Sequence, residues 1–143
     1  MLDSTKNPIL LRDEICELLR SRGVTPTSQR IEIGSVLLAQ PQHLSAEQIL
    51  AEVRRHGLRV SKATIYNTLN LFVRQGLVRE VNVDPTRTFY DSTTHPHHHF
   101  FNADTGELID IPPNSVVFEQ MPVLPEGTVQ DRVDVVIRLR NES

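Results

Sequence analysis

Cysteine and tryptophan are almost absent from this sequence of 143 residues: Cys16 is the single cysteine, and there is no tryptophan. One thiol excludes an internal disulfide and excludes a zinc clamp built from Cys-x-x-Cys pairs, because both need partner thiolates. We therefore expect a protein of the reducing cytoplasm.

Long apolar segments are also missing. The longest uninterrupted apolar run, residues 36–39, is four residues long, whereas a membrane-spanning helix needs about 20. The stretch MLDSTKNPILL has an acidic residue early and no basic cluster, so we expect no export signal. With 38% hydrophobic and 23% charged residues, the composition fits a soluble globular chain of one domain or two small ones.

The net charge of −3 is unevenly distributed along the chain. Residues 1–83 contain eleven Lys/Arg and eight Asp/Glu, a balance of +3, whereas residues 84–143 contain four and ten, a balance of −6. This asymmetry indicates a half that faces a polyanion and a half with another task, although chance stays open as an alternative.

Helical spacing of apolar residues predicts four helices in the first half. The first covers residues 8–22 and ends at Gly23. The second follows Thr25 as N-cap, with Pro26 in the first turn. The third starts at Ser45, which has capping-box spacing to Gln48. The fourth covers residues 61–75.

The fourth helix has two different faces. A stripe with helical spacing is expected to be buried: Ile65, Leu69, Phe72 and Val73. The opposite face is rich in hydrogen-bond donors: Lys62, Thr64, Tyr66, Asn67, Asn70 and Arg74. Such a face can lie in the major groove of DNA, with basic side chains on phosphates and Tyr66 and Asn67 at base edges. An ordinary solvated helix face is the alternative.

A β-hairpin follows this helix and favours the DNA interpretation. The segments LVREVNV and TFYD read as strands, and DPTR reads as a type I turn between them. Three helices, a polar fourth helix and a hairpin are the element order of a winged helix-turn-helix domain, in which Arg87 would lie at the wing tip beside the DNA backbone. Thr27 and Arg30, near the start of the second helix, are further candidates for phosphate contacts.

The remaining chain predicts a small second domain. We expect strands at residues 97–101 and 107–111, a short helix at 115–121 and a last strand at 129–140. So thin a sheet buries itself poorly, and we expect a homodimer to complete it. The expected fold class is α+β, with a winged-helix DNA-binding domain at residues 1–91 and a dimerisation and metal-sensing domain at residues 92–143.

Four of the six histidines lie within residues 95–99. In a strand, His97 and His99 share one face and His98 points to the other, so the first two can reach one ion. Further ligands could come from three side chains elsewhere: His43, Asp91 and Asp110. Nitrogen and oxygen ligands without thiolates favour Fe(II), Mn(II), Co(II) or Zn(II).

Three alternatives to this metal site remain at this point. Histidine pairs in strands are often structural. A haem group could instead bind the run His97, His98 and His99. Two histidines with a carboxylate also occur in non-haem iron enzymes, although this two-lobed, aromatic-poor chain offers no obvious substrate pocket.

Four motifs in this order make the chain resemble the ferric uptake regulator family of bacterial metal-responsive transcription factors: H-x-SAE, ATIYNTL, TFYD and H-x-HHH. The resemblance covers about residues 10–140 and is closest to the iron response regulator branch. It implies that the protein is not an enzyme but a homodimeric repressor that binds a palindromic operator in double-stranded DNA. It also implies a sensory metal site formed by five residues: His43, Asp91, His97, His99 and Asp110. Aspartate at positions 91 and 110 resembles the peroxide-sensing members.

The chain departs from the family's pattern at two other metal sites. The structural zinc clamp uses two Cys-x-x-Cys pairs, the first of which would fall at Asn102 and Thr105, so we expect no structural zinc held by four cysteines. A further site is incomplete, because Pro96 and Val117 stand at two of its ligand positions. Cys16 precedes Glu17 and not proline, so the Cys-Pro haem motif of the iron response regulator branch is absent too.

Overall fold

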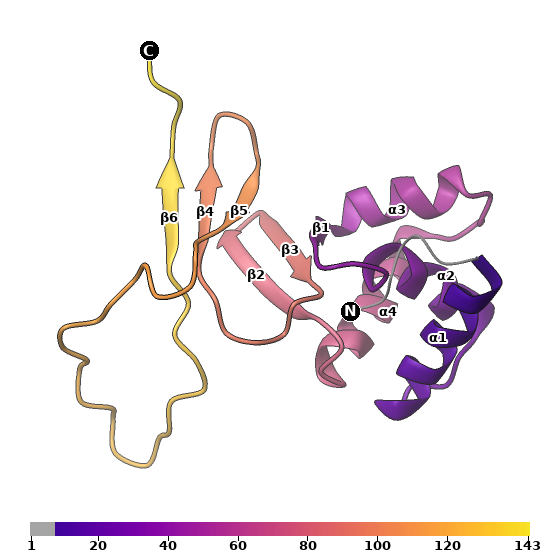
Figure 1. Ribbon diagram of the computed structural model, residues 1–143, viewed down its shortest axis with the longest axis horizontal. Helices are drawn as coiled ribbons and strands as arrows, with labels where there is room; N and C mark the ends of the chain where they lie inside the picture. Colours follow the sequence, from indigo (N-terminus) through magenta and orange to yellow (C-terminus); the bar gives the residue numbers. More distant parts are fainter. Residues whose placement is uncertain (1–7) are drawn as a thin grey trace. The chain divides into compact units, whose positions relative to one another are not determined.

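The structure, a computed structural model, describes residues 8–143, and these form two compact units (Figure 1). Unit 1 ends at Thr94 and unit 2 begins at His95. Residues 1–7, which make up most of the stretch expected to lack an export signal, lie outside the described residues. No helix in the described part of the chain is long and apolar enough to cross a bilayer.

Unit 1 contains the four predicted helices: α1 (Pro8–Ser21), α2 (Ser28–Leu37), α3 (Ala46–Arg55) and α4 (Lys62–Arg74). The predicted start of α2 is wrong by two residues. Thr27, and not Thr25, is its N-cap, because the Thr27 hydroxyl accepts the backbone N–H of Arg30. The capping box of Ser45 and Gln48 at the start of α3 is confirmed.

Apolar side chains from all four helices form one core. Ile65, Leu69 and Phe72 of α4 are fully buried, which confirms three of the four positions of the predicted stripe; Val73 is partly buried against the same core. Gly34 lets α1 and α2 approach closely, because a Cβ at that position would lie 3.0 Å from the Ile15 side chain. The polar side of α4 is thereby left at the surface.

A three-stranded antiparallel sheet completes unit 1, in the order β1-β3-β2. Strands β2 (Arg79–Asp84) and β3 (Arg87–Asp91) are the predicted hairpin, and β1 (His43–Ser45) is a short strand that the sequence did not predict. Tyr90 of β3 packs into the helical core, and its burial is the main reason that its pKa rises to about 12.

Unit 2 is a second three-stranded sheet, in the order β5-β4-β6. Strand β4 (His99–Asn102) pairs antiparallel with β5 (Leu108–Asp110) and parallel with β6 (Val136–Leu139). The strand predicted at residues 97–101 begins two residues later than expected, so His97 and His98 precede it, and the last two predicted strands are shorter than expected. Phe101 and Leu108 are buried on one side of this sheet. With helices in unit 1 and small sheets in both units, the chain has the expected α+β class.

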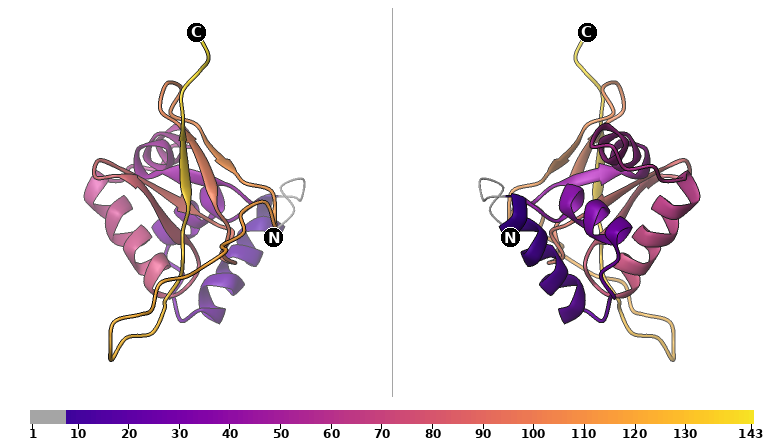
Figure 2. Two further views of the ribbon diagram at one scale, coloured as in Figure 1. Left: turned by 90° about the vertical axis from the view of Figure 1, so that its left-hand side faces the viewer. Right: turned by 90° about the vertical axis from the view of Figure 1, so that its right-hand side faces the viewer.

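The helix predicted at residues 115–121 is wrong. This segment has no regular structure and belongs to a long loop between β5 and β6 (Figure 2). Prolines 112, 113 and 122 bracket it, and so short a helix is unstable without a surface to pack on. Val117 is 83% exposed, so the structure gives it no such surface.

Candidate metal centre and nucleic-acid interface

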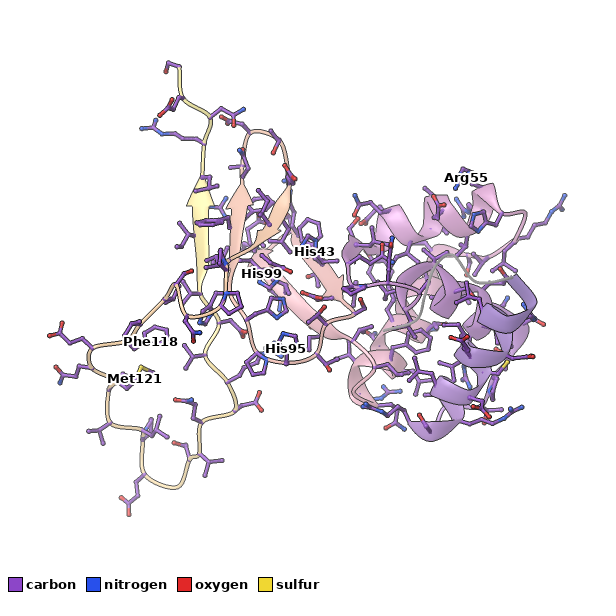
Figure 3. All side chains as sticks on the ribbon, in the orientation of Figure 1. His43, Arg55, His95, His99, Phe118 and Met121 are labelled. Atoms are coloured by element: carbon purple, nitrogen blue, oxygen red, sulfur yellow. The ribbon has the colours of Figure 1, made fainter. Side chains whose placement is uncertain are left out.

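Unit 1 places a histidine and an aspartate opposite each other. His43 of β1 and Asp91 of β3 are paired residues of the antiparallel ladder. Asp91 is only 2% exposed, and its Oδ1 accepts the backbone N–H of Thr93 at 2.8 Å. The His43 ring, which is labelled in Figure 3, lies edge-on to Phe89, with 6.3 Å between ring centroids. Two potential metal ligands are thus fixed on neighbouring strands of one sheet.

Ser92 reinforces this pair of strands, a role that sequence reasoning missed because DSTT resembles an ordinary linker. Ser92 is 6% exposed and is held by the turn before β1. Its backbone N–H donates to the Gln42 carbonyl at 3.0 Å, and its hydroxyl oxygen accepts the Gln42 N–H at 3.0 Å. The end of β3 is therefore tied to the segment that carries His43.

Unit 2 holds the second group of potential ligands. His99 of β4 is paired with Asp110 of β5 in the antiparallel ladder. The Nε2 atoms of His97 and His99 lie 3.5 Å and 3.3 Å from the same oxygen, Oδ1 of Asp110. His99 is buried, whereas the side chain of Asp110 is 57% exposed. The donor atoms of His97, His99 and Asp110 lie within 4.8 Å of one another, and the exposed Asp110 side leaves the group accessible to solvent.

A backbone hydrogen bond orients the His97 ring. Its Nδ1 lies 2.8 Å from the carbonyl oxygen of His95. A carbonyl only accepts, so Nδ1 must carry a proton, and the neutral ring keeps its lone pair on Nε2, on the side of Asp110. Metal-bound histidines commonly donate their second N–H to a backbone carbonyl in this way. His97 is therefore prepared as an Nε2 ligand.

His98 has the opposite arrangement. Its Nδ1 accepts the backbone N–H of Val135 at 3.0 Å, so the proton of the neutral ring lies on Nε2. The ring stands edge-on to Phe118, with 6.0 Å between centroids, and the loop residues Phe118 and Met121 line the same recess (Figure 3). His98, directly before β4, thus links the start of that strand to the segment before β6, and the lone pair on its Nδ1 is engaged.

Hydrogen bonds close the β4–β5 turn, where the resemblance would place the first Cys-x-x-Cys pair. The Asn102 side-chain oxygen accepts the backbone N–H groups of Asp104 and Thr105 at 2.9 and 3.1 Å. The Asn102 amide nitrogen donates to the side chain of Asn141 at 2.8 Å, and the Asn141 N–H donates to Asp104 at 2.8 Å. This turn is therefore joined to the C-terminal segment without thiolates.

The eight candidate DNA-contacting residues all lie in unit 1. Four of them line one shallow recess between α2 and α4: Thr27, Arg30, Thr64 and Asn67. Arg30 also donates to the Thr25 carbonyl at 2.9 Å, which orients its guanidinium. The other four lie elsewhere, Lys62, Tyr66 and Arg74 on α4 and Arg87 at the first residue of β3. Helix α4 contains no acidic residue, so its polar face is uniformly neutral or positive.

Glu47 is a neighbour of this face that the sequence did not single out. It lies in the first turn of α3, and its carboxylate accepts a hydrogen bond from the Tyr66 hydroxyl at 3.1 Å. Burial, together with this hydrogen bond, raises the pKa of Tyr66. The side chain of Tyr66 is therefore engaged by α3 and is not a freely rotating surface group.

Comparisons with known proteins point in one direction. The model of the ferric uptake regulator family matches residues 21–132. The peroxide-responsive repressor PerR of Staphylococcus saprophyticus is 34% identical over 100 residues, which are 70% of this chain and 67% of that protein. PerR of Staphylococcus epidermidis is 32% identical, over 68% of this chain and 65% of its own length. The chain thus spans about two thirds of the length of these relatives.

Solved structures agree in fold. The ferric uptake regulator of Pseudomonas aeruginosa with manganese superposes with a TM-score of 0.64 at 26% identity, over 89% of this chain and 97% of that one. The ferric uptake regulator of Vibrio cholerae gives 0.67 at 22% identity, over 88% and 98%. These likenesses confirm the α+β fold with an N-terminal helical and a C-terminal sheet region.

The opposite orientations of His97 and His98 can be observed in solution. In metal-free protein with neutral imidazole rings, we expect the Nδ1–H tautomer at His97 and the Nε2–H tautomer at His98. Side-chain ¹⁵N NMR distinguishes the two tautomers, with His97→Gln and His98→Gln variants to assign the signals. The same tautomer at both positions would contradict the hydrogen bonds described above.

Proposed function

Because the chain belongs to the ferric uptake regulator family, whose members are metal-responsive transcriptional regulators and not enzymes, we propose that it binds operator DNA as a homodimer under the control of one divalent metal ion. One observation carries this proposal: each unit contains a fixed part of a ligand set. His43 and Asp91 are paired in unit 1, and His97, His99 and Asp110 converge in unit 2.

The donor atoms fit a bare divalent ion. All five side chains offer nitrogen or oxygen, and none offers a thiolate, which suits Fe(II), Mn(II) or Zn(II). His97 is already oriented by a backbone carbonyl. Asp91 is buried, so a cation beside it would compensate a carboxylate that has lost much of its hydration. When bound, the ion would supply coordination bonds to side chains of both units.

Such a site would couple metal binding to DNA binding through the short strand β1. His43 begins β1, and Ser45 at its end is the N-cap of α3. Helix α3 packs against α4, the proposed reading helix. Metal that holds His43 and Asp91 together with the histidines of unit 2 would restrict the orientation of α4 relative to the dimer half. The ion would then shift a balance between orientations by its higher affinity for one of them.

DNA reading requires two copies of unit 1 in a fixed arrangement. Helix α4 would enter the major groove, with Tyr66 and Asn67 at base edges and Lys62, Arg74 and Arg87 at phosphates. Strand β6 is an edge strand of unit 2, and Ile109 and Ile137, which flank Phe100 across the sheet, are 39% and 40% exposed. These features support a homodimer formed through unit 2. A twofold-symmetric dimer in the cytoplasm would read a palindromic operator.

Haem is the alternative effector, as the resemblance to the iron response regulator branch implies. We favour the bare ion, because His98, at the centre of the run His97–His99, already uses its lone pair for the Val135 N–H. Haem bound at this run would have to break that hydrogen bond, or its iron would have to be coordinated without His98. A Soret band that saturates at one haem per chain, together with metal-independent operator binding, would favour haem.

The His43→Ala variant tests the link between the two units. We expect it to lose the metal-dependent gain in operator affinity, which for coupled sites is typically about 5- to 150-fold, while the dimer stays folded. His56→Ala is the matched control, because His56 caps α3 at its other end and contacts Glu52 instead. Fluorescence anisotropy on operator DNA, with and without Mn(II), measures the gain; an undiminished gain in His43→Ala would refute the coupling.

Salt dependence tests the phosphate contacts. Replacing Arg74 or Arg87 by glutamine should each make the slope of log affinity against log salt concentration less negative by about two, because each position supplies one phosphate contact in each subunit of the dimer and each contact releases about one counterion. Arg12→Gln is the control, since Arg12 is already paired with Glu32 at 2.8 Å. Slopes equal to that of the unmodified protein in both variants would remove these two residues from the interface.

A further inference from the structure

Three side chains from two helices meet at the centre of the proposed reading face. The Tyr66 hydroxyl donates to Oε1 of Glu47 at 3.1 Å. The Lys62 ammonium lies 3.8 Å from the same oxygen and 5.9 Å from the centre of the Tyr66 ring. Lys62 and Tyr66 are one helical turn apart on α4, whereas Glu47 comes from α3. A carboxylate on a face proposed to bind DNA is unfavourable by itself, because it repels the phosphates.

The hydrogen bond determines what Tyr66 can offer to a base. A phenol has one proton and can also accept, whereas a carboxylate only accepts. The proton of Tyr66 must therefore point to Glu47, and the phenolic oxygen keeps only its lone pairs for other partners. In the major groove these lone pairs match an exocyclic amino group, N6 of adenine or N4 of cytosine, and oppose a keto oxygen, O6 of guanine or O4 of thymine.

We propose that Glu47 is a specificity-determining residue that makes Tyr66 an acceptor and thereby selects an amino-bearing base over a keto-bearing base at one position of each operator half-site. Glu47 touches no base in this scheme and acts through Tyr66, so it is a positioning residue. Lys62 offsets its negative charge, and the first turn of α3 is a favourable place for a carboxylate. The inference rests on the proposed function, because it needs α4 in the major groove.

Two substitutions of Glu47 separate its hydrogen bond from its charge. Glu47→Ala removes both, and frees the Tyr66 hydroxyl to donate to a keto oxygen. Glu47→Gln removes the same charge but keeps an oxygen that can accept the Tyr66 proton. Tyr66→Phe removes the reading group and identifies the position at which Tyr66 acts. Glu52→Ala is the control for the loss of one exposed acidic side chain from α3, because Glu52 contacts Arg55 and His56 instead.

The experiment starts with selection of operators from a random duplex library by the full-length protein with Mn(II). If the unmodified protein enriches no palindrome, the proposed function fails, and this inference fails with it. If it enriches one, affinities are measured for operators with each adenine replaced by guanine and each cytosine replaced by thymine, in the unmodified protein and all variants. Thermal unfolding confirms that each variant is folded.

At the position where Tyr66→Phe removes the preference, the unmodified protein should bind the keto-bearing operator about tenfold more weakly. This penalty should shrink most in Glu47→Ala, less in Glu47→Gln and not at all in Glu52→Ala. Three results would overturn the inference while leaving the proposed function intact: a preference for the keto base, equal effects of the alanine and glutamine variants, or no position affected by Tyr66→Phe.

Discussion

A ladder of three residue pairs between β1 and β3 is the constraint on which the account of this protein depends. It places His43 directly opposite Asp91, and Ser92 extends it by hydrogen bonds to the turn before β1. The end of β1 is also the start of α3, because Ser45 caps that helix. A displacement of His43 on metal binding would thus be transmitted to the helical core, and through α3 to the polar face of α4. The family's function as metal-responsive regulators needs a connection of this kind.

Backbone groups give different tasks to neighbouring, chemically identical side chains. His97 donates through Nδ1 to a carbonyl, which leaves Nε2 for a ligand, whereas His98 accepts an N–H at Nδ1 and links the segments that precede β4 and β6. The same principle extends to Tyr66, whose hydroxyl donates its hydrogen bond to the Glu47 carboxylate. In each case a fixed hydrogen-bond partner, and not the side chain alone, decides whether a donor or an acceptor faces outward.

The parts of the fold that follow from local sequence were predictable, and the parts that depend on distant partners were not. Residues 61–75 carry an apolar stripe and a cap, so α4 and its buried face were correctly predicted. Strand β1 has three residues, too few for any periodic pattern, and exists only because β3 pairs with it. Ser92 looked like a linker residue because its partner, Gln42, is distant in the sequence. Residues 115–121 include β-branched and aromatic residues that are weak helix formers, and no surface in the described part of the chain stabilises the helix that was expected there. The assignment to the iron response regulator branch stays a prediction.

If one ion restricts the orientation of unit 1 relative to unit 2, a distance measured between the two units tests that restriction most directly. Spin labels at Glu17→Cys on α1 and Glu107→Cys on the β4–β5 turn, in a Cys16→Ser background diluted with unlabelled chains, would report one distance between the units. Pulsed electron paramagnetic resonance should give a broad distribution without metal and a narrow one with diamagnetic Zn(II), and His43→Ala should keep it broad. A distribution that Zn(II) leaves unchanged, in protein shown to have bound the ion, would contradict the account.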